Sequence, residues 1–255
     1  MILFPCLNRV GKIVSVLSPT LLLFSSLSPQ LLAESRPEWK ISLEFPPAED
    51  RGAPSRTTGG GTRGPVCMED GVLPLTALMP TPNNVGTTAT TKPTFFMYVP
   101  KTIAKSAEFV VVDETGKEVY LSNFPLPTTN GIVKVDIPAA SPLEVGKEYT
   151  WQFALVCDAR ERDKDRFVRG TIRPVELSSD LKQKLNGAAS PLEKAKLLAG
   201  AKIWNDTLNI LAQLRSTYPA EWQEFLKSVN LEALASQPIV ECCTAEKSQL
   251  ITGNQ

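Results

Sequence analysis

The sequence contains no histidine among its 255 residues. Imidazole is the usual general base near neutral pH and the commonest metal ligand in proteins. Its absence excludes Ser-His-Asp and Cys-His catalytic arrangements and every zinc site that needs a histidine ligand. Paired carboxylates and a Ser-Lys dyad remain chemically possible. We therefore expect a protein that is not an enzyme, and we keep a histidine-independent hydrolase as the alternative.

The chain also lacks an excess of charge of either sign, because Lys+Arg and Asp+Glu both number 27. No global field would draw it to nucleic acid or to an anionic membrane, so we expect no nucleic-acid partner. Gly59, Gly61 and Gly64 match the spacing of a dinucleotide-binding loop. Such a loop needs a strand before it and a helix after it, whereas here a polar run precedes it and Pro65 follows. We expect no cofactor.

The N-terminus has the three parts of a secretory signal peptide. Arg9 and Lys12 make the start basic, residues 13–27 form an apolar run, and Ala33 precedes a polar stretch. Serines and a proline interrupt the apolar run, which makes it a poor permanent membrane span. We predict a signal peptide over residues 1–33, cleaved after Ala33, and no stable membrane span after cleavage. The protein is then expected in the cell envelope, either in the periplasm or outside the cell. A retained membrane anchor is the alternative.

Residues 34–65 are rich in Pro, Gly, Ser, Thr and charged residues and have few apolar side chains to bury. Such a segment cannot offset the entropy lost on ordering, so we predict that it is disordered, basic and glycine-rich. Arg56 and Arg63 flank three glycines within it. With neighbouring backbone N–H groups they could grip an anionic group, which makes them candidate partner-binding residues. A solubilising linker is the alternative.

Residues 66–177 have the pattern of short β-strands separated by turns. An apolar, aromatic run lies between Pro93 and Pro100, and an Asp-Glu-Thr-Gly turn separates two further runs. The expected strands are 94–99, 107–112, 117–121, 131–137, 149–157 and 167–175. Their spacing predicts a mainly β fold, an immunoglobulin- or fibronectin III-like β-sandwich with a helical tail.

Leu143, Gly146 and Tyr149 form the pattern L-x-x-G-x-x-Y at the start of one expected strand. This pattern is typical of a tyrosine corner, in which the hydroxyl group bonds to upstream backbone. We therefore predict that Tyr149 is a structural corner residue. An ordinary turn followed by a core tyrosine is the alternative.

Residues 178–236 change to helical spacing. Ser190 and Glu193 form a capping box with Pro191 at the first helical position. An apolar stripe then recurs at intervals of three and four residues: Leu197, Ala201, Trp204, Leu208 and Leu211. We predict two or three α-helices that cap the sandwich or dock beside it, with Trp204 and Trp222 as core anchors. Because Pro238 ends the pattern, we predict a flexible tail over residues 237–255.

Four cysteines follow the leader, and none forms a C-x-x-C pair, which excludes a zinc ribbon or a thioredoxin-like site. Cys67 lies just before the first expected strand, Cys157 ends the most strongly alternating one, and the other two cysteines lie outside the sandwich, so we predict a Cys67–Cys157 disulfide in an oxidising compartment. Free thiols are the alternative. Cys242 and Cys243 are adjacent and lie beyond the helical pattern. We expect no structural role for them.

The expected loop over residues 158–166 mixes both charges. Arg160 and Arg162 are candidate partner-binding residues, and Asp163 and Asp165 are weak candidates for a metal. The loop lacks the glycine and the spacing of a dedicated calcium loop. A solvated hairpin tip is the simpler interpretation.

Several stretches give the chain a family likeness over about residues 50–235. They are residues 56–64, 75–80, 93–100, 151–158 and 167–170, together with 199–208, where Lys202 and Asn205 depart from the family's pattern. In these stretches the chain resembles a family of exported cyanobacterial proteins catalogued as a domain of unknown function. The resemblance implies a cyanobacterial envelope protein and carries over no activity or catalytic residue.

Taken together, these observations predict an exported, non-catalytic envelope protein that acts as a binding or scaffold module for a protein partner. One alternative is a hydrolase that uses carboxylates of the 158–165 loop. Another is a periplasmic regulator of a membrane sensor. A deep pocket lined by convergent acids would favour the hydrolase, and a flat or grooved surface would favour the binding module.

Overall fold

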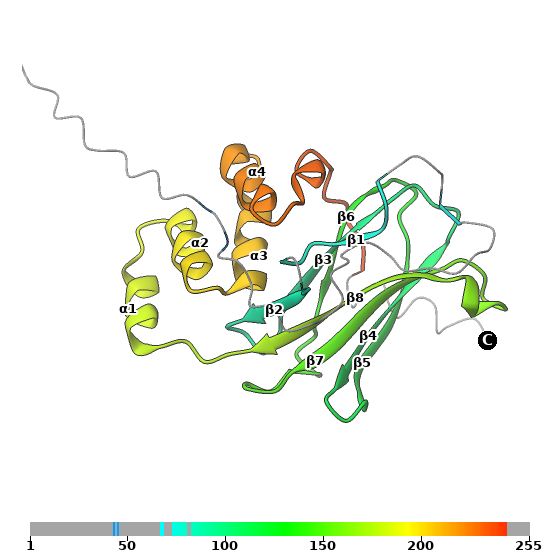
Figure 1. The fold of residues 1–255 in the computed structure, drawn as a ribbon, viewed down its shortest axis with the longest axis horizontal. Coiled ribbons are helices and arrows are strands. Elements are labelled where there is room, and N and C mark those ends of the chain that lie inside the picture. Colours follow the sequence, from blue (N-terminus) through cyan, green and yellow to red (C-terminus); the bar gives the residue numbers. More distant parts are fainter. Residues whose placement is uncertain (1–42, 44, 46–66, 69–72, 81–82, 244–255) are drawn as a thin grey trace, which may run out of the picture. The chain divides into compact units, whose positions relative to one another are not determined.

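The computed structural model describes residues 43, 45, 67–68, 73–80 and 83–243. Internal contacts divide the chain into residues 1–40 and 41–255, and every described residue lies in the second unit. The expected signal peptide lies outside the described residues. The described residues form eight strands in two sheets, followed by four α-helices (Figure 1). The prediction of a mainly β fold with a helical tail is confirmed.

The two sheets have the strand order of an immunoglobulin-like sandwich. The smaller sheet has the order β1-β3-β6, with β1 (Thr76–Ala77), β3 (Thr94–Val99) and β6 (Gly131–Asp136). The larger sheet has the order β2-β8-β7-β4-β5, with β2 (Val85–Thr88), β8 (Arg166–Pro174), β7 (Tyr149–Val156), β4 (Ser106–Asp113) and β5 (Glu118–Pro125). Strand β2 pairs with β8 in parallel, and the other pairs are antiparallel.

Alternating apolar side chains from both sheets fill the sandwich core. Side chains alternate between the two faces of a sheet, so residues two positions apart in a strand share a face. Trp151 and Phe153 of β7 both point into the core and are fully buried. The ring of Phe95 on β3 lies 5.3 Å from that of Trp151 and 5.0 Å from that of Phe109 on β4. Each such side chain contributes roughly 1.5–3 kcal/mol when fully buried. This core holds the two sheets together.

The tyrosine corner is formed as the sequence predicts. The backbone N–H of Glu144 donates a hydrogen bond of 2.9 Å to the hydroxyl oxygen of Tyr149, the first residue of β7. Gly146 has φ +86°, a left-handed conformation that suits glycine, and Leu143 is buried. The structural role predicted for Tyr149 is therefore confirmed.

A disulfide joins Cys67 to Cys157, as predicted, with the two Cα atoms 5.5 Å apart. Cys157 directly follows β7, and the carbonyl of Cys67 accepts a hydrogen bond of 3.0 Å from the N–H of Ile103. The covalent bond closes a loop of 90 residues. It attaches the chain that precedes β1 to the end of a central strand.

The tail has four α-helices rather than two or three: α1 (Ser179–Gly187), α2 (Pro191–Gly200), α3 (Trp204–Leu214) and α4 (Pro219–Lys227). The continuous stripe expected from Leu197 to Leu211 is split at Lys202, which has φ +61°. The N–H of Ile203 reaches back to the carbonyl of Leu198, a Schellman ending in which Lys202 takes the position usually held by glycine. None of the helices in the described parts of the chain could cross a membrane, given its length and apolarity.

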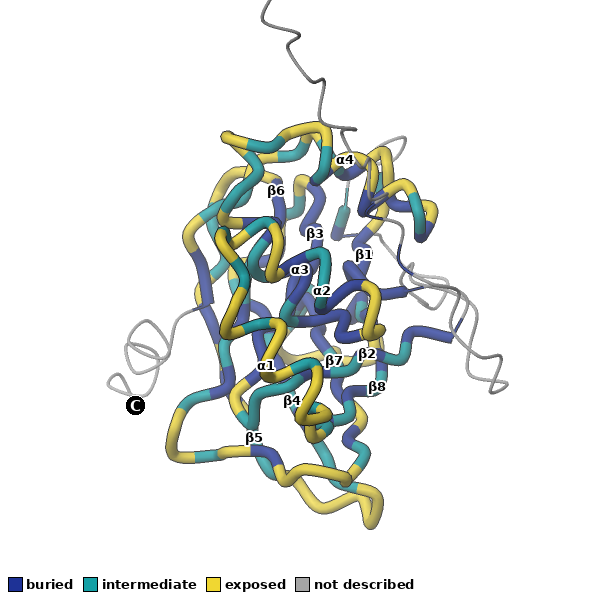
Figure 2. Tube along the Cα trace, turned by 90° about the vertical axis from the view of Figure 1, so that its left-hand side faces the viewer, coloured by how far each residue is buried: buried dark blue, intermediate teal, exposed yellow. Residues whose placement is uncertain are grey.

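The predicted cap of α2 is present. The N–H of Glu193 donates to the Ser190 hydroxyl oxygen at 3.1 Å, and the Glu193 carboxylate accepts from the N–H of Ala189 at 2.7 Å. The first bond satisfies a donor that the first turn of a helix leaves unpaired, and the second ties the turn to the residue before the N-cap. Helix α1 buries no residue, whereas α3 is buried along one side (Figure 2).

Helix α3 packs against β2 and β3 and builds an aromatic cluster with distant residues. Trp204 stacks on Phe225 of α4 at 4.7 Å, and Phe45 meets Trp204 edge-on at 4.8 Å. Leu43 and Phe45 are buried, so the prediction that residues 34–65 are disordered is wrong at these two positions. The surface that covers Phe45 comes from α3 and α4, so local composition carried no sign of it. Trp204 and Trp222 are core anchors as predicted.

The prediction of a flexible tail from residue 237 is wrong up to residue 243, and we call residues 237–243 the strap. The N–H of Ile132 on β6 donates to the carbonyl of Pro238 at 2.7 Å, and the N–H of Val240 donates to the carbonyl of Ile132 at 2.9 Å. Cys242 and Cys243 are buried and disulfide-bonded to each other, contrary to our expectation for them. The strap is held because β6 is an edge strand whose backbone groups need partners. Residues 244–255 lie outside the described residues.

Candidate functional site

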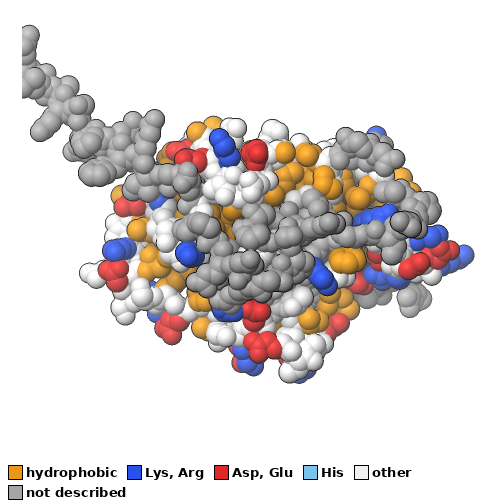
Figure 3. Space-filling model, in the orientation of Figure 1, with side chains coloured by type: hydrophobic (Ala, Val, Ile, Leu, Met, Phe, Trp, Pro, Cys, Tyr) orange, Lys and Arg blue, Asp and Glu red, His pale blue; other side chains and the backbone are white. Residues whose placement is uncertain are grey.

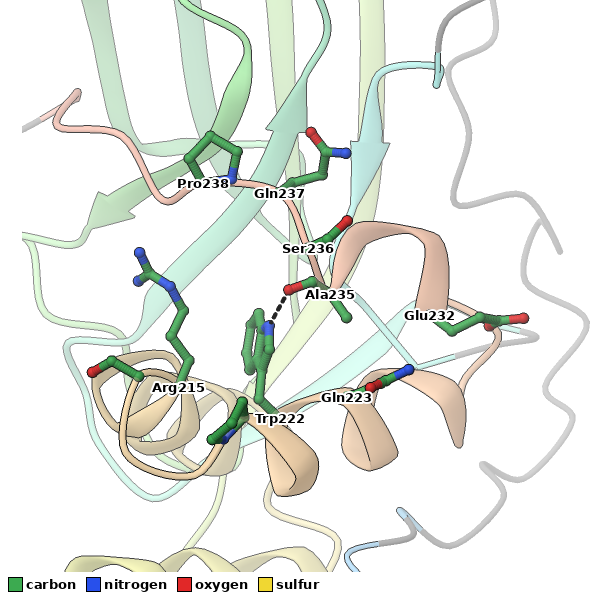
Figure 4. A pocket seen from close by; sticks show the side chains of 10 residues that line it. Arg215, Trp222, Gln223, Glu232, Ala235, Ser236, Gln237 and Pro238 are labelled. Atoms are coloured by element: carbon green, nitrogen blue, oxygen red, sulfur yellow. Dashed lines mark hydrogen bonds between the residues drawn. The ribbon is translucent and has the colours of Figure 1, made fainter.

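Two hollows lie where the helices meet the strap and the residues just before it, and together we call them the groove. The larger, of about 540 Å³, is bounded by the α3–α4 turn, α4 and residues 232–238 (Figure 4). The smaller, of about 260 Å³, is bounded by the second half of α3, by Lys134 of β6 and by the strap. Arg215, the residue that follows α3, borders both hollows. We take this groove as the candidate functional site.

The larger hollow has an aromatic wall and polar sides. The indole N–H of Trp222 on α4 donates to the carbonyl of Ala235 at 3.0 Å, which fixes the ring against the segment that precedes the strap (Figure 4). Gln223, Glu232 and Gln237 add amide and carboxylate groups around it. Apolar surface with a few placed polar groups is the usual composition of a binding site.

Arg215 is a cation that forms no ion pair with any residue in the described part of the chain. Its guanidinium donates to the carbonyl of Ala212 at 3.4 Å, a weak bond within one helical turn. Figure 4 shows the side chain rising from the end of α3 toward the strap. A half-buried guanidinium at the junction of two hollows is suited to a carboxylate or phosphate, which it can bind with two parallel hydrogen bonds.

The smaller hollow carries both signs of charge. The Lys134 ammonium lies 3.1 Å from the Asp136 carboxylate on the same strand, and Glu241 of the strap lies on the hollow's border. Phe96, which is paired with Lys134 across β3 and β6, contributes an apolar wall. The hollow therefore lies directly beside the edge of the smaller sheet.

The candidate residues of the 158–165 loop are engaged with one another. Arg162 pairs with Glu108 at 3.0 Å and with Asp165 at 2.5 Å, and hydrogen bonds to these two carboxylates raise the pKa of its guanidinium. Asp165 also accepts a bond of 3.0 Å from the N–H of Cys157 and is 8% exposed. Arg160 is exposed. Cations and acids gather at this end of the sandwich (Figure 3), so the loop is an ion-paired end of the β7–β8 hairpin.

The remaining predicted site residues fall in two places. Arg56 and Arg63 lie outside the described residues. Asp163 and Asp165 belong to the loop at the far end of the β7–β8 hairpin from α1. Within the described ranges there is no group of three or more His, Cys, Asp or Glu side chains that could hold a metal ion.

Sequence reasoning missed Arg215 and the strap. The available signal was local: after Pro238, the β-branched pair Ile239 and Val240 precedes two cysteines, which is more typical of a packed extended segment than of a flexible tail. Arg215 had no signal of its own, because a basic residue at the C-terminal end of a helix is common, where it interacts favourably with the helix dipole.

No curated protein matches the chain. A family model described as Domain of Unknown Function (DUF928) matches residues 58–239. The matched range includes the sandwich, the four helices and the strap as far as Ile239, which forms the bridge to β6. The matched range is most of the chain, and the chain therefore belongs to this family, DUF928.

Proposed function

We propose that this protein is an exported, non-catalytic envelope protein that binds a protein partner through the groove between the helices and the strap. The observation that carries the proposal is Arg215, a cation at the junction of two hollows whose walls mix aromatic and polar groups. Residues with this placement are typical of recognition surfaces, where Trp and Arg contribute most of the binding energy.

The size and wall composition of the groove support binding. The larger hollow, about 540 Å³, is within the range of roughly 300–1,000 Å³ typical of ligand sites. Among the described residues that line it, Glu232 is the one carboxylate, whereas a carboxylate hydrolase uses a pair of acids.

The hydrolase alternative finds less support in the 158–165 loop. Asp165 is held by Arg162 and by the N–H of Cys157, and Glu161 pairs with Lys164. Carboxylates committed to such bonds act as structural groups. A periplasmic regulator of a membrane sensor would use the same groove, and it differs from a scaffold module only in the identity of its partner.

Export is supported by the three-part leader over residues 1–33 and by the Cys67–Cys157 disulfide, a bond typical of oxidising compartments. A cyanobacterial source is supported by the resemblance of the stretches described above to an exported cyanobacterial family. N-terminal sequencing of protein recovered from the envelope tests the leader. We expect a start at Glu34, and an intact Met1 would contradict export with cleavage.

The binding function is tested by pull-down from cyanobacterial envelope extracts with the tagged protein. We expect a specific partner whose capture is reduced about tenfold or more by Arg215→Gln, because a charge-assisted bond is lost. Lys227→Gln, which neutralises an exposed lysine at the end of α4, is the control and should capture the partner normally. Capture lost with Arg160→Gln but kept with Arg215→Gln would move the site to the 158–165 loop. Failure to capture any partner would refute the function.

A further inference from the structure

We propose that an extended segment of the partner adds a strand to the open edge of β6 and places a carboxylate on Arg215. This inference rests on the proposed function, because it specifies how the groove is occupied. Strand addition is a common mode of peptide recognition in which main-chain bonds give affinity and side-chain pockets give specificity.

The direction of the backbone groups of β6 follows from its pairing. In an antiparallel pair, residues alternate between those bonded to the partner strand and those whose N–H and C=O point away from it. The N–H and the C=O of Ile132 both bond to the strap, so they point away from β3. Ile132 and Tyr98 are therefore a pair without backbone hydrogen bonds between them. Lys134 and Asp136 lie two and four residues further on. Their backbone groups therefore point to the same outer edge as those of Ile132.

The strap covers this edge at Ile132 and then leaves it. Val240 makes the last backbone bond to β6, and Cys243 has φ +64°, which turns the chain. The sulfur of Cys242 lies 3.6 Å from the carbonyl of Pro125, the last residue of β5 in the other sheet. Among the described residues, none forms a backbone bond with Lys134 on its outer side. An incoming strand could pair at Lys134 and Asp136 without displacing the strap.

The smaller hollow provides the space for this strand. Its border includes Lys134, the second half of α3 and the strap from Ile239 to Cys242, so it lies beside β6 where the backbone bonds of the strap to β6 end. By contrast, Thr87 of β2 uses its hydroxyl group to bond to the backbone at Lys202 and Trp204, so β2 is attached to the α2–α3 turn. No described residue bonds to the outer backbone groups of Lys134, beside the smaller hollow.

The charged residues around the smaller hollow favour a partner segment that carries an acidic residue. The Lys134 ammonium is held by Asp136, whereas the Arg215 guanidinium has no carboxylate partner within the described ranges. A guanidinium binds carboxylate and phosphate groups with two parallel hydrogen bonds, and of these an unmodified peptide segment carries the carboxylate. Glu241 on the opposite border of the smaller hollow repels a second acid, so we expect one acidic residue at a defined position rather than an acidic run.

The test is a selection from a phage-displayed library of random heptapeptides on the purified protein. We expect enriched peptides that share one Asp or Glu within a run of β-branched residues. A synthetic selected peptide should bind Arg215→Gln about tenfold more weakly. If wild-type protein enriches no peptides, or if Arg215→Gln binds the selected peptide equally well, the proposal is wrong.

The contribution of the edge is tested with Lys134→Pro, which removes the outward N–H but no bond of the β3–β6 ladder. We expect it to abolish peptide binding, while Lys134→Ala, which removes only the side chain, retains most of it. In case the proline variant does not fold, hydrogen exchange on wild-type protein is the second measurement. The peptide should protect the amides of Lys134 and Asp136, and protection on β5 instead would overturn the proposal.

Other occupants of the edge give distinct results. A wild-type dimer that Lys134→Pro converts to a monomer would assign the edge to a second copy of the chain. Peptide binding only after removal of residues 244–255 would assign it to that segment. Either result overturns the inference. A partner captured equally by wild type and Lys134→Pro would also overturn it, while leaving the proposed function in place.

Discussion

Two of the buried tryptophans among the described residues lie in two aromatic clusters that are assembled in different ways. Trp151 on β7 lies among its sheet neighbours, directly across from Gly170 on β8, where a Cβ would come within 2.9 Å of the indole ring. Trp204 on α3 is surrounded by residues from far along the chain, including Phe45 and Phe225. One cluster follows from strand pairing and the other from long-range packing.

The polar ends of the two indoles differ as well. The N–H of Trp204 donates to the carbonyl of Leu78 at 3.0 Å, a bond between residues 126 positions apart. The N–H of Trp151 has no hydrogen-bond partner among the described residues. The comparison shows that the helices are attached to the sandwich by directional bonds as well as by apolar contact. It predicts different responses to matched substitutions in the two clusters.

The largest expected effect comes from Trp204→Ala, which removes the ring that joins α3, α4 and Phe45. Truncating a fully buried tryptophan costs about 3–5 kcal/mol in the free energy of unfolding. Denaturant unfolding followed by far-ultraviolet circular dichroism measures it. A loss below about 1 kcal/mol would mean that the cluster is not part of the cooperative core.

Two matched variants sharpen the comparison of the indole bonds. Trp204→Phe leaves the buried carbonyl of Leu78 without its donor, whereas Trp151→Phe breaks no hydrogen bond. We therefore expect Trp204→Phe to lower the free energy of unfolding by about 1–3 kcal/mol more than Trp151→Phe does. If both variants lose the same free energy of unfolding, the bond to Leu78 makes no net contribution to stability.

A smaller effect is expected where the strap meets β6. At Gly131 a Cβ would lie 2.7 Å from the carbonyl oxygen of Pro238 and 2.8 Å from a methyl carbon of Val240. Gly131→Ala should therefore displace the strap and, as overpacking does, lower the free energy of unfolding by about 1–3 kcal/mol. Faster amide exchange at Ile132 and Val240 would report the displacement. Gly187→Ala is the control, because a Cβ there meets nothing within 4 Å.

The smallest expected effect concerns the pH dependence contributed by Asp206 on α3. Its carboxylate accepts bonds from the Thr88 hydroxyl at 2.7 Å and the Ala89 N–H at 3.1 Å, but burial is the larger influence and raises its pKa. A raised folded pKa means that the group's contribution to stability is full below the unfolded pKa. That contribution is lost as pH rises through the folded value.

Asp206→Asn keeps an oxygen acceptor and does not titrate. The stability of wild type relative to this variant should therefore fall as pH rises from the ordinary aspartate pKa of 3.8. Urea unfolding at a series of pH values measures the difference. Parallel stability curves for the two proteins would contradict the raised pKa.

Features carried by short stretches of sequence could be predicted. The alternation of β7, the turn pattern that ends in Tyr149 and the serine cap at Ser190 are local, and each is formed as expected. The physical cause of each of these features lies in a few neighbouring residues. The Cys67–Cys157 bond, which closes a loop of 90 residues, was also predicted, because the other two cysteines lie outside the expected sandwich.

Features that depend on a distant partner could not be predicted. Phe45 is buried only because α3 and α4 supply its surroundings, and the strap is ordered only because β6 offers an edge. Lys202 and Asn230 adopt positive φ to end helices, where the sequence offers no glycine to mark the turn. The groove and Arg215 share this property, because their walls come from separate segments.

The sequence by itself determined the strand and helix content, the sandwich with its tyrosine corner and the disulfide that closes it, since these depend on residue spacing and local bonding. Tertiary structure alone decided where the helices dock, which backbone edge of β6 stays open and which cation faces the groove. The physical reason is that burial and backbone pairing are shared between segments far apart in the chain. Neither segment carries the information alone.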